Sequence, residues 1–78
     1  MTTAESAPHF AGGHLTGTVT DFDAEVGWGV VSSEGADYPF HSTAIADGTR
    51  LIDVATAVAF EVVPGRMGRW EGSALRAL

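Results

Sequence analysis

The segment Val58-Ala59-Phe60-Glu61-Val62-Val63-Pro64-Gly65 carries the clearest structural signal in this chain of 78 residues. The large apolar side chains of Val58, Phe60 and Val62 alternate with neighbours that would face the other way, which is the period of two of a half-buried β-strand. Pro64-Gly65 then ends the run, because proline has no N–H for a strand ladder and glycine is typical of turns. The sequence therefore predicts a strand that stops at this dipeptide.

Four further runs of β-forming residues flank this strand, and turn signals separate them. They cover residues 15–20, 28–31, 38–41 and 73–78. Hairpin loops are predicted at 32–37 and 65–72, a helical turn at 42–45, and a longer loop at 46–56. Five short strands at nearly regular spacing, without an amphipathic helix, indicate an all-β fold. Their number in so short a chain favours a five-stranded antiparallel OB-fold barrel.

Alternation also predicts which side chains fill the interior of this barrel. The expected core consists of Val19, Phe22, Phe40, Val58, Phe60 and Val62. Tyr38 is compatible with either side of its strand. Pro39 places the same strand at an edge of the sheet, or close to a strand end, because its ring nitrogen cannot donate to a ladder.

Length and composition limit the organisation of the chain. We expect residues 1–14, rich in Thr, Ala, Ser and Gly, to be a flexible tail, and residues 15–78 to be a single folded domain. An apolar fraction of 45% with a charged fraction of 18% excludes the intrinsically disordered class. Cysteine is absent, which excludes disulfides and thiolate metal sites. The chain shows neither a long apolar run nor a secretory signal, which predicts a cytoplasmic protein.

Five motifs follow one another in the folded part of the chain. They are Gly17-Thr18-Val19, Phe22-Asp23, Gly27-Trp28-Gly29-Val30-Val31, Asp37-Tyr38-Pro39-Phe40-His41 followed by Ser-Thr-Ala-Ile, and Val58-Ala59-Phe60-Glu61-Val62. In order and spacing they resemble the cold-shock domain family. The resemblance implies that rings on the second and third strands stack on successive bases of single-stranded DNA or RNA, while basic groups follow the backbone.

The candidate nucleic-acid-binding residues are Trp28, His41, Arg66, Arg69 and Trp70. By resemblance, Trp28 takes the place of the family's first stacking phenylalanine, and His41 keeps the family's histidine. Trp70 replaces a residue that is usually small or proline, and it lies beside two arginines, which stack on bases and bind phosphate. Each residue also has a structural alternative. The first two would be ordinary strand residues, Trp70 a cap over the barrel end, and the arginines solvated loop charges.

The chain departs from the family pattern at six positions of the expected binding face. Asp21 stands where the family usually has a stacking tryptophan, and Thr20 and Val26 each replace a lysine. Val30, Pro39 and Ser42 each replace an aromatic residue. Four missing rings at the low end of the stacking range correspond to ~4 kcal/mol, or roughly a thousandfold in affinity. We therefore expect weak binding.

The net charge of -6, from ten carboxylates and four arginines with no lysine, disfavours long-range attraction to phosphate. It leaves open a second function, in which the barrel has lost nucleic-acid binding and its acidic first strand meets a basic protein partner. The oligomeric state expected for either function is a monomer.

The sequence contains no pattern for which we assign catalysis, a cofactor or a metal. His9 and His14 lack a third ligand, and Asp21, Asp23 and Glu25 lack the spacing of a calcium loop and a nucleophilic partner. A solvated acidic face is the simpler interpretation of these three carboxylates. The chain is therefore expected to be a binding module and not an enzyme.

Overall fold

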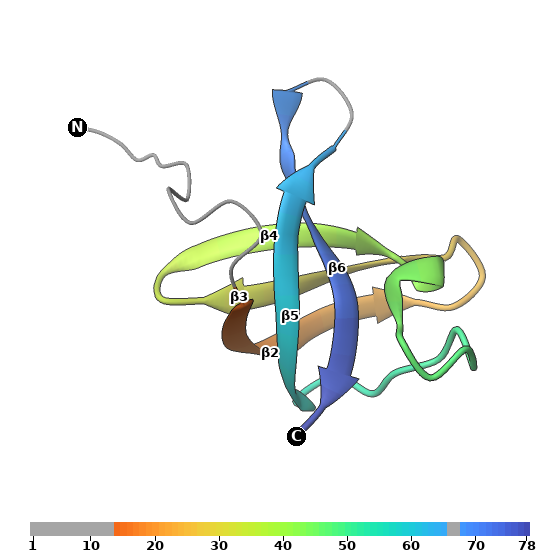
Figure 1. The fold of residues 1–78 in the computed structure, drawn as a ribbon. Coiled ribbons are helices and arrows are strands. Elements are labelled where there is room, and N and C mark those ends of the chain that lie inside the picture. Colours follow the sequence, from red (N-terminus) through yellow and green to blue (C-terminus); the bar gives the residue numbers. More distant parts are fainter. Residues whose placement is uncertain (1–13, 66–67) are drawn as a thin grey trace.

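A computed structural model describes residues 14–65 and 68–78 of the chain. Within these residues five β-strands and one short 3-10 helix alternate with turns (Figure 1). The strands are β2 (His14–Asp23), β3 (Trp28–Ser33), β4 (Ala36–His41), β5 (Ala57–Pro64) and β6 (Trp70–Ala77), and the helix is η1 (Ser42–Ala44). The described part of the chain has no helix of the length and apolarity needed to cross a membrane.

The described strands form one antiparallel sheet in the order β4-β3-β2-β5-β6. The sheet is strongly twisted, so that β5 and β6 cross β2, β3 and β4 at a steep angle (Figure 1). Its two edge strands, β4 and β6, come close to each other without a ladder between them in the described residues. Just after η1, Ile45 forms a parallel bridge with Leu75, and the N–H of Ala46 donates to the carbonyl of Leu75 at 2.8 Å. The all-β prediction is confirmed, and the hydrogen-bonded sheet itself remains unclosed.

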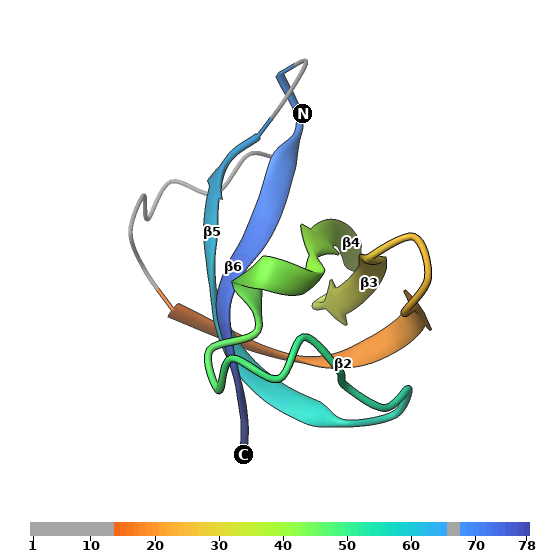
Figure 2. The same cartoon turned by 90° about the vertical axis from the view of Figure 1, so that its right-hand side faces the viewer.

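The strands curve around the core, and Figure 2 shows this curvature in a view turned by 90° from Figure 1. The buried apolar side chains are Val19, Val31, Phe40, Ile45, Val58, Phe60, Val62 and Leu75. The alternation in β5 is thereby confirmed. Phe22, which was expected in the core, is only half-buried and packs against it, as do Tyr38 and Trp70. Tyr38 contacts the Phe60 ring at a centroid distance of 5.8 Å.

Two hairpins differ from the predicted boundaries. The β3–β4 turn contains only Glu34 and Gly35, with φ angles of 52° and 84°, which is the left-handed backbone of a two-residue hairpin. The predicted six-residue loop at 32–37 was too long, because its polar residues belong to the strands: Ser32 and Asp37 pair across β3 and β4, and the buried Ser33 hydroxyl donates to the Thr16 carbonyl at 2.7 Å. Strand β6 likewise begins at Trp70, which pairs with Pro64, so this tryptophan is a strand residue and not part of a loop.

Gly29 allows two aromatic rings to approach each other under β3. It pairs with Phe22 on one side and Phe40 on the other, and these rings stack at a centroid distance of 6.0 Å and an angle of 8°. A Cβ at Gly29 would lie 2.6 Å from both the Phe40 ring and the Asp21 carbonyl oxygen, and 2.9 Å from the Phe22 ring. The bare side of this glycine therefore faces the interior.

We predict that Gly29→Ala lowers the free energy of unfolding by about 1–3 kcal/mol, because the added methyl group overpacks the ring pair. Urea denaturation followed by circular dichroism measures the change. In a Phe22→Leu background the same substitution should cost less, because one of the opposing rings is smaller. Equal costs in both backgrounds would assign the strain to Phe40 and the Asp21 carbonyl instead of the Phe22 ring.

Candidate functional site

The convex face of β2, β3 and β4 carries three cross-strand rows of side chains. Residues that pair directly across antiparallel strands share one face. The rows are Asp23–Trp28–His41, Asp21–Val30–Pro39 and Thr18–Ser32–Asp37. Aromatic and apolar groups therefore occupy the centre and one end of the face. The exposed carboxylates are Asp21 and Asp23 on β2 and Asp37 on β4.

Trp28 and His41 form the aromatic end of this face. Their ring centroids lie 5.1 Å apart with an interplanar angle of 83°, so the two rings meet edge to face. Both side chains are half-buried. Because the planes are perpendicular, the two rings cannot stack on one base together, and each offers a separate contact.

His41 is held in place by the chain that follows it. Its Nδ1 accepts the backbone N–H of Thr43 at 3.2 Å and lies 2.9 Å from the Thr43 hydroxyl oxygen. His41 is thereby the N-cap of η1, a helical turn that the sequence predicted at 42–45. Since Nδ1 is the acceptor, the neutral imidazole carries its proton on Nε2, which is then a hydrogen-bond donor.

The turn between β2 and β3 positions Trp28 opposite His41. The Asp23 carboxylate accepts the N–H groups of Glu25 and Val26 at 3.0 and 3.2 Å. At the end of the turn, the Gly27 carbonyl accepts the N–H of Ser42 at 2.8 Å, which ties the turn to the start of η1. Asp23 therefore has a structural role that its interpretation as a solvated carboxylate did not include.

A hollow of about 450 Å³ lies beside the two rings, lined by Trp28, His41, Pro64, Gly65 and Glu71. The last three residues belong to the β5–β6 hairpin. The Glu71 side chain lies against Gly65, where a Cβ would overlap it. The hairpin thus approaches the Trp28 end of the sheet, and Glu71 lines the same hollow as the aromatic pair.

Sequence reasoning missed Pro64, Gly65 and Glu71 as neighbours of Trp28. Pro64-Gly65 was identified only as the end of a strand, and Glu71 only as part of a hairpin. They could have been predicted from the β5–β6 hairpin, because the twist of a small barrel turns the end of one pair of strands toward the other strands of the sheet.

The remaining predicted site residues lie farther along the same hairpin. Arg69 is exposed, and its backbone carbonyl accepts the N–H of Gly65 at 2.6 Å. Trp70 is half-buried and packs against the core, and it is not among the residues that line the hollow. Arg66 lies outside the described residues. The structure therefore brings Trp28 and His41 together and gives Trp70 a packing contact.

The acidic residues near the face form no evident ion site. Among residues 14–65 and 68–78, no group of three or more histidine or carboxylate side chains could hold a metal ion. His14 lies 4.0 Å from the Glu61 carboxylate on the far part of the sheet, where both side chains are exposed. His9, the other histidine of the predicted tail, lies outside the described residues.

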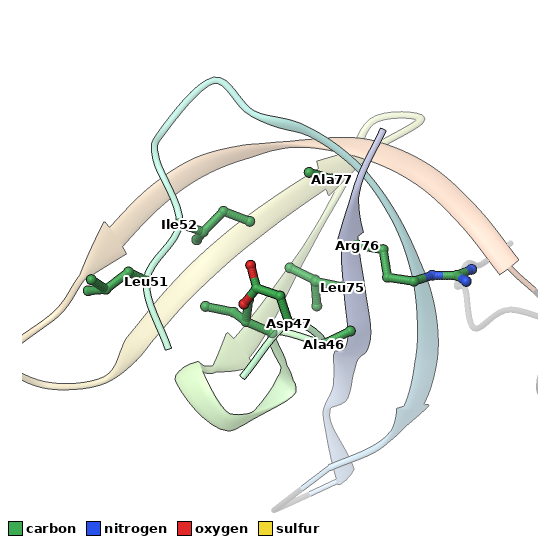
Figure 3. Close-up of a pocket in the computed structure, with 8 residues that line it drawn as sticks. Ala46, Asp47, Leu51, Ile52, Leu75, Arg76 and Ala77 are labelled. Atoms are coloured by element: carbon green, nitrogen blue, oxygen red, sulfur yellow. The ribbon is translucent and has the colours of Figure 1, made fainter. Parts of the chain in front are cut away.

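A second hollow, also about 450 Å³, separates the 46–56 loop from the end of β6 (Figure 3). Its walls are formed mainly by Ile45, Leu51, Ile52 and Leu75, and the Arg76 guanidinium points away from it. Asp47 stands at its rim, where hydrogen bonds from the backbone and hydroxyl of Thr49 lower the pKa of the carboxyl. With no aromatic ring in its lining, this hollow offers no stacking surface.

Comparison with known proteins identifies the class to which this sheet and its aromatic face belong. No protein-family profile matches the chain. The chain is 42% identical over 55 residues to the cold shock-like protein CspLB of Listeria monocytogenes, and the match covers 68% of this chain and 83% of that protein. The chain therefore belongs to the cold-shock domain family.

The structure refines the departures from the family pattern. Asp21, Val30 and Pro39 occupy one row of the convex face, so the three substitutions there remove rings from a continuous surface. Ser42 is only 8% exposed and is bound to the Gly27 carbonyl, so it does not belong to that surface. Val26 is 64% exposed beside Gly27, where a basic side chain would reach solvent.

We predict that His41→Ala lowers the free energy of unfolding by about 0.5–2 kcal/mol, because it removes the N-cap acceptor. His41→Asn also removes the ring but restores a short acceptor for the Thr43 N–H, so it should recover about half of that loss or more. Thermal denaturation of the three proteins measures the difference. If both variants are equally unstable, the cap does not contribute to stability.

Proposed function

We propose that this chain binds single-stranded DNA or RNA weakly, by stacking bases on the convex face of an OB-type barrel. The observation that carries the proposal is the Trp28–His41 pair, half-buried at 5.1 Å beside an open hollow. A ring with one accessible face is a platform for any base, because every base has a π-face. Membership of the cold-shock domain family supports the same function.

The OB-type architecture is supported by the strand order and by the contact between the two sheet edges. Strands β4 and β6 lie at opposite ends of the hydrogen-bonded order, and the Ile45–Leu75 bridge joins η1 to β6. This bridge ties one edge strand, β6, to the segment that follows the other edge strand, β4. The face formed by β2, β3 and β4 is then the outer wall of the barrel, where a single strand would lie.

The expected weakness of binding has two sources in this face. Val30 and Pro39 stand opposite each other next to Trp28, and neither supplies a ring. Asp21 extends the same row and is exposed, so it repels a passing phosphate. Arg69 is an exposed cation on the hairpin, and with Arg66 it would contribute the backbone contacts.

A second candidate function is supported by the exposed carboxylates of the same face. Asp21 and Asp37 flank its apolar centre, and exposed Val26 adds an apolar group at the turn. A basic protein segment would fit this surface, with its charges toward the carboxylates. A face that binds only such a partner would leave oligonucleotides unbound, so the same titration separates the two functions.

We predict that pyrimidine-rich or purine-rich single-stranded oligomers change the tryptophan emission of the protein at low salt. Trp70→Phe leaves Trp28 as the only indole, so its emission reports directly on the aromatic face. Trp28→Ala should weaken binding by about 5- to 150-fold, since stacking contributes about 1–3 kcal/mol per base. Anisotropy of a labelled oligomer measures this loss.

Trp70→Ala tests whether the hairpin extends the site. An unaltered affinity would restrict binding to β3 and β4, whereas a loss comparable to that of Trp28→Ala would include the hairpin. Emission that stays unchanged up to high micromolar oligomer would overturn the nucleic-acid proposal. Salt should affect the affinity only slightly. Each phosphate that a cation neutralises on a single strand adds about -0.7 to the slope of log affinity against log salt concentration, and this chain has few cations.

We further predict that Val30→Phe raises the affinity for single strands by about 5-fold or more, because it adds a ring between Trp28 and Pro39. The matched control is Val54→Phe, which adds the same ring at a 55% exposed position in the 46–56 loop. Anisotropy titrations compare the two variants. An equal gain in both would indicate non-specific hydrophobic binding.

A further inference from the structure

The hollow beside Trp28 contains a feature that stacking alone does not require. Glu71 enters it from β6, 43 residues away in sequence from Trp28, and the carboxylate lies over Gly65. A carboxylate in the same hollow as the stacking ring is not a group that binds phosphate. It can, however, accept hydrogen bonds from the edge of a base.

The bases differ in what they offer to a carboxylate. Guanine carries two neighbouring donors on its Watson–Crick edge, N1–H and N2–H₂, which match the two oxygens of one carboxylate. Adenine and cytosine offer one amino group beside a ring nitrogen that accepts, and thymine or uracil offers one N–H between two carbonyl oxygens. A carboxylate therefore pairs in bidentate fashion with guanine and repels part of the edge of the other bases.

We propose that this hollow is a guanine subsite, in which Trp28 stacks on the base and Glu71 accepts hydrogen bonds from its N1–H and N2–H₂ groups. The inference rests on the proposed function, because it assigns a base to the same aromatic face. It needs only part of the hydrogen-bonding capacity of Glu71, since a carboxylate has about four lone-pair positions and can keep other contacts.

His41 lines the same hollow as Trp28 and Glu71. Its Nδ1 is occupied by the Thr43 N–H, so the neutral ring presents Nε2–H as a donor. Guanine has acceptors at O6 and N7, next to its donor edge. The hollow is therefore lined by an indole that can stack, a carboxylate that can accept and an imidazole, and guanine is the base whose two neighbouring donors match the carboxylate.

The test uses the full chain and labelled heptamers that differ at one central base. The protein should bind TTTGTTT about 5-fold or more tighter than the all-thymine heptamer, as expected for a bidentate base contact. Replacing the guanine with inosine, which lacks the N2 amino group, should remove most of this advantage. The inosine comparison needs no protein variant, so it holds even if a substitution impairs folding.

Glu71→Gln keeps the size of the side chain and removes its second acceptor oxygen. It should reduce the preference for guanine to less than about 2-fold. The matched control is Glu34→Gln, at the β3–β4 turn on the opposite end of β3 from Trp28, which removes the same charge and should retain the preference.

Three results would overturn the inference. Equal affinities of the wild-type protein for the guanine, inosine and thymine heptamers would show that no base is read, while stacking stands. An unchanged preference in Glu71→Gln, or a gain of equal size for all heptamers, would show that Glu71 acts only as a charge. If no heptamer binds, the guanine subsite and the proposed function fail together.

Discussion

The stacking of Phe22 on Phe40 beneath Gly29 is the contact on which the outer face depends. Successive side chains of a strand point to opposite faces of the sheet. A row of residues that faces the interior therefore fixes the neighbouring rows on the outer face. With Phe22, Gly29 and Phe40 facing inward, Trp28 and His41 must face outward on their own strands. A slip of one residue in β3 would bury Trp28 and expose Val31, which the closely packed ring pair disfavours.

The sequence predicted the strands well where their periodicity is strong, and less well where turn geometry sets the boundaries. The alternation of β5 and the edge position of Pro39 in β4 followed from elementary rules. The length of the β3–β4 hairpin did not, because the left-handed backbone of Glu34 cannot be read from its residue type. The extra residue of β2, Thr20, is likewise invisible in the sequence, although the register shift around it bends the strand.

For the candidate site, the sequence predicted only the residues that lie on the neighbouring strands β3 and β4. Trp28 and His41 were identified through resemblance, and their pairing across β3 and β4 places the rings in contact. The approach of Glu71 required the twist of the whole sheet, since β6 is three strands away from β3 in the hydrogen-bonded order. Trp70 shows the opposite case. The sequence left it open between a binding residue and a cap over the barrel end, and the structure packs this half-buried residue against the core.

The acidic character of the face follows from the separate roles of its carboxylates. Asp23 accepts the N–H groups of Glu25 and Val26 in its own turn, so one of its oxygens has a structural role. Asp21 and Asp37 are exposed on the face, and Glu71 lies in the hollow. Such a surface cannot attract a polyanion over long distances, because the repulsion acts before contact. Affinity for a single strand would therefore have to come from short-range contacts, for which the exposed Arg69 and the rings of Trp28 and His41 are the candidate partners.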